Sequence, residues 1–474
     1  MYMAQKVLVL EVNEIPLRVF RQFAVLRPGS HIDQMLQSAQ VMETLAQDVD
    51  EAFLYPSQTW ASLNTGAPYS GHKIHWYNDP KPGEYPLYWK TAAENGVSVG
   101  TVCTLHSSPA EAFAASNDNY KFVIPDCFAS DSYTKPGYFE PFQALSLKAV
   151  SANSRATSLR APVRESTRAL LNSPRYGIRM RTMAQGISMV IQILRKKVNR
   201  ERLRNLQFPV LADIFMSQFE KHDPELAILF TNHVAANMHR YWYGLFPEDY
   251  GAEIYDQKWL EKYNGEINAA VDLLDSYIGT FMRLAKKKDR VLIVVSSMGQ
   301  KANQKLTPEF RKEHSIDYRL EDVNTFVSHV TKNRYSFRVD SAMVPQYSLA
   351  FRNEEEATRA AAEMREMQPG LQGINLTLDQ NKEIVTISAQ LIQPATAFSI
   401  NGKAYGHKDL GFLRLEVEDH HSGCHTPEGS LIIYNSRTSK AAKPAVNYLE
   451  YAPALLKHFG IAPLPYMLEP SFTI

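Results

Sequence analysis

The 474-residue chain has 45% hydrophobic and 21% charged residues, an ordinary balance that excludes a disordered or fibrous protein. Its formal net charge of +1 gives no global attraction to nucleic acid or to an anionic membrane, so any basic patch must be local. Cys103, Cys127 and Cys424 lie far apart in the sequence. The apolar runs at residues 7–10 and 186–194 are too short for a signal-peptide core or a membrane span. We therefore expect a cytoplasmic protein without disulfide bonds or a structural zinc module.

Short apolar runs along the chain predict buried strands. They cover residues 6–11, 226–232, 290–297 and 430–434, and the first three end in polar residues. Such runs are typical of strands that are covered on both faces of a parallel sheet. With amphipathic helical segments between them, they predict an α/β fold with a doubly wound, mostly parallel sheet and helices on both faces.

Two long segments between these strands are predicted to be inserts. The expected core comprises residues 1–141, 223–301 and 422–474. Residues 142–222 show no strand pattern and form a predicted helical, Arg-rich cap. Residues 302–421 form a predicted small α+β subdomain, because strand-like residues 347–351 and 383–388 flank a Glu/Ala/Arg-rich helical stretch.

The most specific segment of the chain is 55–74, with the sequence YPSQTWASLNTGAPYSGHKI. It resembles the nucleophile segment of the type I phosphodiesterases and nucleotide pyrophosphatases of the alkaline phosphatase superfamily. The matching residues are Thr59, Thr65, Gly66, Pro68, His72 and Ile74, and Lys73 stands where that family usually has glycine.

The resemblance implies that Thr59 is the catalytic nucleophile. A threonine hydroxyl needs a base or a metal ion to attack at neutral pH, and a helix start can hold a phosphate oxygen on its free N–H groups. The simpler alternative is that Thr59 only caps a helix.

The same resemblance implies metal ligands at four strand ends, and several of these ligands are altered here. The family's first Asp aligns with Asn13, its middle Asp with Asn232, and its later Asp-His pair with Ser297 and Met298. His239 and His425 fall at retained histidine positions. Because an amide or hydroxyl cannot offset a divalent charge as a carboxylate does, the site beside Thr59 is expected to be largely dismantled.

We therefore expect at most one well-held divalent ion, zinc or manganese. His239 and His425 are the predicted ligands, with His233 as a further candidate whose alternative role is a structural hydrogen bond. Asn13 is predicted to act in catalysis by donating a hydrogen bond to phosphoryl oxygens. The predicted substrate-binding residues are Asn232, Glu14, His72 and Ser297. Glu14 and Glu11 are also candidates to replace the missing negative charge, although both cannot point the same way along one strand.

A basic stretch from Arg155 to Arg204 has thirteen Arg or Lys residues against two Glu. A solvated helical face explains it most simply, and an Arg-rich grip on phosphate groups is the alternative. Few aromatic residues are interleaved with it, so nucleic acid is not an expected partner.

The sequence thus predicts a phosphoric ester hydrolase or phosphoryl-group transferase acting through Thr59 on a phosphodiester or a phosphorylated glycan intermediate. The alternative is a catalytically inactive protein that binds an anionic ligand or partner in the same crevice. Sulfatase-like hydrolysis fits less well, because the chain lacks the Cys-x-Pro-x-Arg motif of that branch. The oligomeric state is left open.

Overall fold

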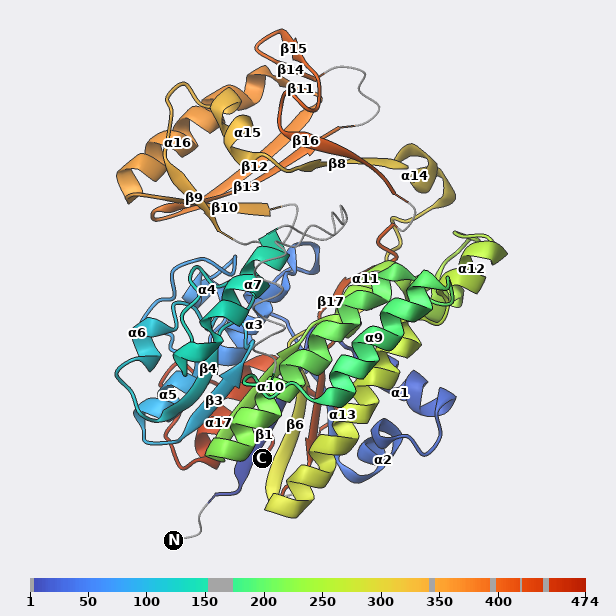
Figure 1. The fold of residues 1–474 in the computed structure, drawn as a ribbon. Coiled ribbons are helices and arrows are strands. Elements are labelled where there is room, and N and C mark those ends of the chain that lie inside the picture. The colour runs from blue at the N-terminus through green and yellow to red at the C-terminus, as the bar shows by residue number, and fades with distance from the viewer. Residues whose placement is uncertain (1–3, 152–173, 341–345, 393–397, 418–419, 438–442) are drawn as a thin grey trace.

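The computed structural model describes residues 4–151, 174–340, 346–392, 398–417, 420–437 and 443–474. The chain forms a large α/β body with a smaller α+β body above it (Figure 1). Part of the basic stretch, residues 155–173, lies outside the described residues.

An eight-stranded sheet forms the centre of the large body. In spatial order its strands are β19 (Ala445–Asn447), β2 (Gln40–Leu45), β18 (Ser430–Tyr434), β6 (Arg290–Ser296), β1 (Lys6–Val12), β5 (Leu226–Thr231), β3 (Val99–Val102) and β4 (Tyr120–Ile124). All neighbouring pairs are parallel except those that β18 makes with β2 and β6. The predicted mostly parallel sheet is therefore confirmed, and each predicted strand is present.

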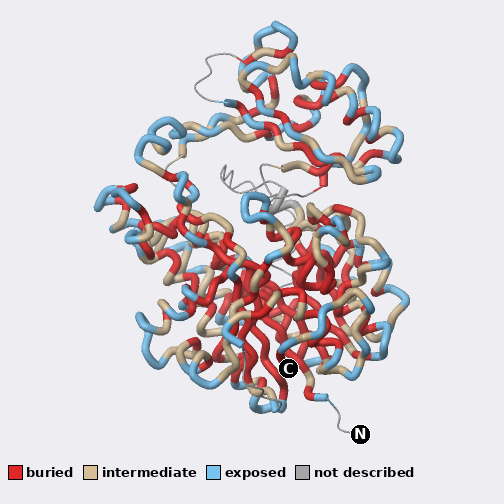
Figure 2. Tube along the Cα trace, turned by 180° about the vertical axis from the view of Figure 1, so that it is seen from behind, coloured by how far each residue is buried: buried red, intermediate tan, exposed pale blue. Residues whose placement is uncertain are grey.

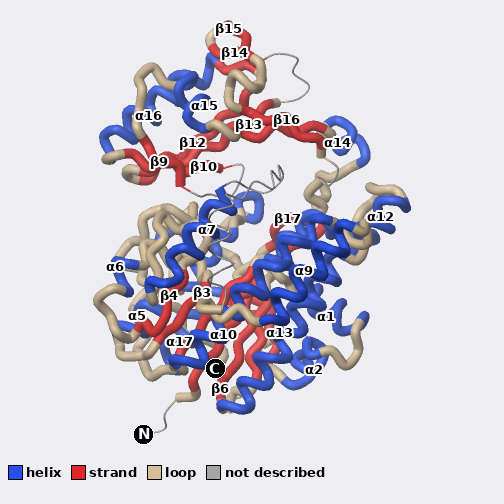
Figure 3. Tube along the Cα trace, viewed as in Figure 1, coloured by secondary structure: helices blue, strands red, loops and turns tan. Residues whose placement is uncertain are grey.

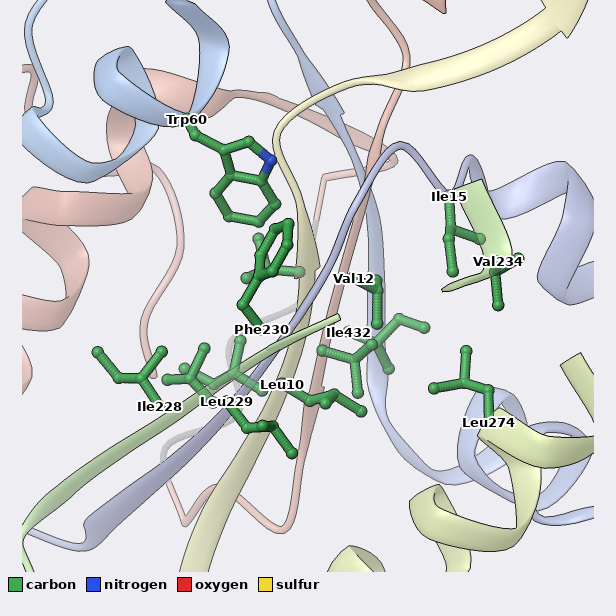
Figure 4. Packing of buried hydrophobic residues seen from close by; sticks show 14 of the residues in the cluster. Leu10, Val12, Ile15, Trp60, Ile228, Leu229, Phe230, Val234, Leu274 and Ile432 are labelled. Carbon is green, nitrogen blue, oxygen red and sulfur yellow. The ribbon is translucent and has the colours of Figure 1, made fainter. Parts of the chain in front are cut away.

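The central strands are continuous apolar runs because both faces of the sheet are covered. Leu10 of β1 pairs with Leu229 of β5 and with Val294 of β6, and all three are buried. Figure 4 shows these strands packing against Trp60 on one side and Leu274 on the other.

Helices cover both faces of the sheet (Figure 3). On one face α10 (Gln207–His222) contacts β3 and β5, and α13 (Glu266–Lys288) contacts β6, with α11 (His233–Leu245), α2 (His31–Ser38) and α1 (Leu17–Leu26) beside them. The other face carries α3 (Pro56–Thr65), α5 (Tyr88–Glu94) and α17 (Tyr451–His458). The last helix of the predicted cap, α10, is thus a layer of the core.

The remaining helices of the large body are short or peripheral. They are α4 (Tyr69–His72), α6 (Glu111–Ala114), α7 (Glu140–Ser151), α9 (Met180–Leu194) and α12 (Gln257–Tyr263), with 3₁₀ turns η1 (Glu51–Phe53), η2 (Gly137–Phe139), η3 (Arg200–Leu206), η4 (Pro247–Asp249) and η6 (Tyr448–Glu450).

The smaller body has its own hydrophobic core, seen as a separate buried region in Figure 2. Its main sheet is antiparallel, in the order β12 (Ile374–Asn381), β13 (Ile384–Leu391), β10 (Gln346–Phe351) and β9 (Phe337–Asp340), with α16 (Glu354–Met367) packed on it. The other elements are α14 (Pro308–Glu313), β8 (Ile316–Leu320), α15 (Val323–Val330), η5 (Gln368–Gly370), β11 (Leu371–Gln372), β14 (Phe398–Ile400), β15 (Lys403–Tyr405) and β16 (Phe412–Glu416).

A two-stranded ladder connects the two bodies at the edge of the large sheet where the central parallel strands end. In it β7 (Gly299–Ala302) pairs antiparallel with β17 (Gly423–Thr426), which places His425 directly opposite Gln300. Because β7 follows β6 after a two-residue turn, this ladder lies beside the carboxyl ends of β1, β5 and β6. Ligand sites of open α/β sheets lie at that edge.

Candidate metal centre

Three side chains from distant parts of the chain meet at this edge. Glu14 follows β1, His239 lies in α11 after β5, and His425 lies in β17. One donor atom of each lies within 4.8 Å of the other two. The backbone of Glu14 is left-handed, with φ of 56°, a conformation that is uncommon outside glycine. The strand has ended by then, so the Glu14 side chain can turn into the cluster.

Both histidines are oriented by backbone carbonyl groups. The Nδ1 atom of His425 lies 2.8 Å from the carbonyl oxygen of Leu54, and Nδ1 of His239 lies 3.3 Å from that of Gly423. A carbonyl oxygen can only accept, so each Nδ1 carries the proton when the ring is neutral. Each Nε2 then faces the carboxylate of Glu14, at 2.8 Å for His239 and 3.5 Å for His425. Metal-binding histidines are commonly held in this way.

Glu14 also binds two amide side chains. Asn13 donates from Nδ2 to Oε1 of Glu14 at 2.7 Å, and Gln300 donates from Nε2 to Oε2. Sequence reasoning missed Gln300, because its position depends on the β7–β17 register that sets it opposite His425. These bonds fix the carboxylate in one orientation.

The electrostatics of the cluster favour a charged Glu14. Burial alone would raise the pKa of its carboxyl group, but the positive charges of His239 and His425 and the close contact with Nε2 of His239 hold that pKa well below its usual range. Burial would likewise lower the pKa of His425, and the Glu14 carboxylate raises it above the ordinary value. Glu14, one of the two glutamates predicted as candidates to replace the missing negative charge, is therefore favoured in its charged form within the cluster.

The three side chains fit a divalent metal ion. One carboxylate oxygen and two imidazole nitrogens are a ligand set that zinc accepts, and manganese also takes carboxylate and imidazole ligands. Nε2 of His425 and Oε1 of Gln300 are buried and form no hydrogen bond. Buried polar atoms are normally satisfied, so an ion bound by Nε2 of His425 accounts for one of these two exceptions.

The neighbourhood of Thr59, the predicted nucleophile, is closed in this conformation. Thr59 and Ser297 are both fully buried, and their hydroxyl oxygens lie 2.9 Å apart in a hydrogen bond. Met298 beside them is buried as well. In this conformation neither hydroxyl is exposed to a substrate.

Asn13, predicted to donate to phosphoryl oxygens, contacts side chains of the protein in this structure. It is almost fully buried, and its Oδ1 accepts from the indole of Trp60 at 2.8 Å. Its Nδ2 is shared between Glu14 and Oδ1 of Asn232, the latter at 2.8 Å. Asn232 itself is exposed at the rim of the site.

Two further predicted histidines lie outside the cluster. His233 is buried, and its ring nitrogens contact the Thr231 hydroxyl at 2.7 Å and the carbonyl oxygen of Ala270 at 3.1 Å. Burial lowers its pKa to about 4, although the Ala270 bond opposes this. Both ring nitrogens of His233 therefore have structural partners, and this residue is not part of the group that Glu14, His239 and His425 form. Its role as a metal ligand stays a prediction that this geometry does not support.

His72 has an equally structural role. Its Nδ1 accepts from the backbone N–H of Ile74 at 2.9 Å, and its Nε2 contacts the Ser62 hydroxyl at 2.8 Å. Burial lowers the pKa of His72 to about 4, so the ring is neutral at pH 7. It stabilises the turn after α4, and its role as a substrate-binding residue stays a prediction that these contacts do not support.

The rim of the site brings in groups from other segments. The exposed ring of His421 lies 5.5 Å from that of His239, measured between centroids. From the smaller body, Asp379 of β12 lies near enough to His75 to raise the pKa of that ring, against the larger lowering effect of burial. The smaller body therefore approaches the loop that follows α4.

No protein-family model matches the sequence, and comparison with curated proteins gives no match. Several solved structures are similar to the chain. Murine ectonucleotide pyrophosphatase/phosphodiesterase 5 is 12% identical, with a TM-score of 0.38 over 98% of this chain and 97% of that one. The human protein of the same name is 11% identical, with a TM-score of 0.40 over 98% and 96%. Phosphonoacetate hydrolase from Sinorhizobium meliloti 1021, in complex with phosphonoformate, is 12% identical, with a TM-score of 0.39 over 97% and 95%.

Within the described part of the chain, every helix is too short or too polar to cross a lipid bilayer.

Proposed function

We propose that the protein is a phosphoric ester hydrolase that uses one divalent metal ion held by Glu14, His239 and His425. The observation that carries the proposal is the convergence of both Nε2 atoms on one buried carboxylate at the carboxyl edge of the sheet. The resemblance of residues 55–74 to a phosphodiesterase segment supports phosphodiesters, including phosphorylated glycan intermediates, as the substrate class.

The chain's own residues have separate tasks in this proposal. The ion would supply Lewis-acid stabilisation of charge on a phosphoryl oxygen. Asn232 is exposed and uses its Oδ1 to accept from Asn13, so its amide N–H groups are directed to a bound phosphoryl group. Asn13 and Gln300 keep the Glu14 carboxylate in place while charge builds up on the substrate.

The attacking group in the simplest form of the proposal is water. Thr59, the nucleophile expected from the motif, has no exposed surface, and its hydroxyl forms a hydrogen bond with that of Ser297. Attack by Thr59 would require the first turns of α3 to move away from β6, whereas water needs no such movement. A phosphoryl-enzyme and transfer to another acceptor would be expected only from the threonine route.

One assay separates these versions. Hydrolysis of bis(p-nitrophenyl) phosphate is measured with added Zn²⁺ or Mn²⁺ for the wild type and for His239→Ala, Thr59→Val and His329→Ala. His329 is a half-buried histidine of the smaller body whose ring contacts the carbonyl oxygen of Asp409, and it serves as the control. We expect His239→Ala to lose activity by about 100-fold or more, since a metal ligand is removed.

The two remaining variants decide the nucleophile. Activity close to wild type in Thr59→Val supports attack by water, and loss in that variant supports the threonine route. A His239→Ala variant that is as active as His329→Ala would refute the metal-dependent hydrolase itself.

The second candidate is a protein that binds an anionic ligand in this crevice without catalysis. The closed Thr59–Ser297 pair favours it, because the family position of the nucleophile is sealed by uncharged side chains. Binding of one equivalent of metal together with no hydrolysis of any phosphodiester tested would support this role.

A further inference from the structure

Helix α9 (Met180–Leu194) exposes an unusual amount of apolar surface. Among the described residues, twelve large hydrophobic side chains are exposed, and five of them are on this one helix. They are Met180, Ile187, Val190, Ile191 and Leu194, with exposed fractions of 78%, 61%, 46%, 42% and 78%. Such a concentration on one element marks an interaction surface.

These side chains form one stripe. Met180, Ile187, Ile191 and Leu194, with exposed Ala184, recur at alternating intervals of four and three residues. That spacing places them on one face of the helix over a length of about 21 Å. The opposite side rests on α10 and η3, and Thr182 is the only residue of α9 that is buried. The apolar face is therefore not used by the described part of the fold.

Basic residues flank the stripe at both ends. Arg179 and Arg181 lie at the start of α9, and Arg195, Lys196 and Lys197 follow its last residue, all exposed. The chain has no Asp or Glu from residue 175 to residue 200. Within the described residues, Arg195, Lys196 and Lys197 form no ion pair.

The charges decide between the occupants of this face. A second copy of the chain would place basic ends against basic ends, whether the two helices ran parallel or antiparallel. An anionic lipid surface instead accepts the apolar stripe among its acyl chains and the basic ends among its headgroups.

We propose that α9 is an interfacial helix that binds the protein to the surface of an anionic membrane. The basic residues at the two ends of α9 then bind anionic headgroups, although the net charge of the whole chain is only +1. This inference is independent of the metal centre and of the proposed hydrolase activity.

The test is co-sedimentation of the full chain with lipid vesicles. Vesicles of phosphatidylcholine with about a third phosphatidylglycerol are compared with vesicles of phosphatidylcholine alone. The wild type is expected to bind the anionic vesicles, and binding should weaken as salt is raised. The double variant Ile187→Glu with Leu194→Glu should bind at least about tenfold less.

Matched variants control for charge and for folding. Val25→Glu with Phe53→Glu replaces two side chains of similar exposure, 74% and 64%, elsewhere on the surface and should bind like the wild type. Circular dichroism confirms that each variant is folded.

Three results would overturn the proposal. They are absence of wild-type binding to anionic vesicles, equal loss of binding in both double variants, and a wild-type dimer that the α9 variant converts to a monomer. The last result would assign the stripe to a second copy of the chain.

Discussion

The buried Glu11 makes the stability of the protein depend on pH in a direction that can be tested. Glu11 lies in β1 between Phe230 of β5 and Val295 of β6 and is fully buried. Burial raises the pKa of its carboxyl group from the ordinary 4.5 to about 8, and the Thr104 hydroxyl opposes this only in part. The folded protein therefore keeps a proton on Glu11 near neutral pH.

The sign and size of the effect follow from linkage. Between pH 4.5 and about 8 the folded state holds a proton that the unfolded state has released, so the free energy of unfolding falls as pH rises through this window. Each tenfold change in proton affinity is worth about 1.4 kcal/mol, so the full loss above pH 8 is about 5 kcal/mol. Glu11→Gln, which cannot ionise, should escape this loss.

The assay is urea denaturation at pH 5 and at pH 8.5. Relative to the wild type, Glu11→Gln should gain about 3 to 5 kcal/mol in stability between the two pH values. Leu10→Met, a volume-conserving change on the same strand, controls for other titrating groups, and its difference in stability from the wild type should be the same at both pH values. A difference between Glu11→Gln and the wild type that is the same at both pH values would refute the reasoning.

Three further predictions follow from the packing around the site. A Cβ at position 423 would lie 2.5 Å from the carbonyl oxygen of Met238. Gly423→Ala should therefore lower the free energy of unfolding, measured by urea denaturation, by about 1 to 3 kcal/mol and weaken metal binding measured by calorimetry. Unchanged values would contradict the close packing. Thr59→Val should lower the free energy of unfolding by about 1 to 2 kcal/mol, because Ser297 loses its buried hydrogen-bond partner. Adding Ser297→Ala should recover most of that loss, and no recovery would argue against the hydrogen bond. Lys73 has a φ of 56°, a conformation that glycine adopts without strain. Lys73→Gly should therefore stabilise the protein by about 1 kcal/mol and raise its thermal midpoint. A lower midpoint would argue against strain at this position.

The sheet was predictable because its strands are strong local signals. Residues 6–11, 226–232, 290–297 and 430–434 are apolar runs that correspond to β1, β5, β6 and β18. The antiparallel direction of β18 was not predictable, since it depends on the return of the chain from the smaller body. Strands β2, β3 and β4 carry weaker signals: β2 is only partly buried, and β3 is four residues long.

The site was predictable only in part. His239 and His425 lie at positions where the resemblance implies ligands, and the structure brings their rings to 5.1 Å between centroids. The role of Glu14 depends on a left-handed backbone turn, which a glutamate does not signal in sequence. Gln300 depends on strand register between segments more than 120 residues apart.

The burial of Thr59 could not be read from its motif. A threonine near a helix start has the same sequence whether its hydroxyl faces a substrate or Ser297. The same holds for His72, whose partners are a hydroxyl and a backbone N–H, and for His233, whose partners are a hydroxyl and one backbone carbonyl.

The central claim is that Glu14, His239 and His425 hold one divalent ion. Anomalous diffraction at the zinc edge from crystals grown with Zn²⁺ tests it most directly. One strong anomalous peak is expected within about 2.3 Å of Nε2 of both histidines and of a Glu14 oxygen. A strong peak elsewhere with none at this position, or no peak at all at full zinc loading, would contradict it.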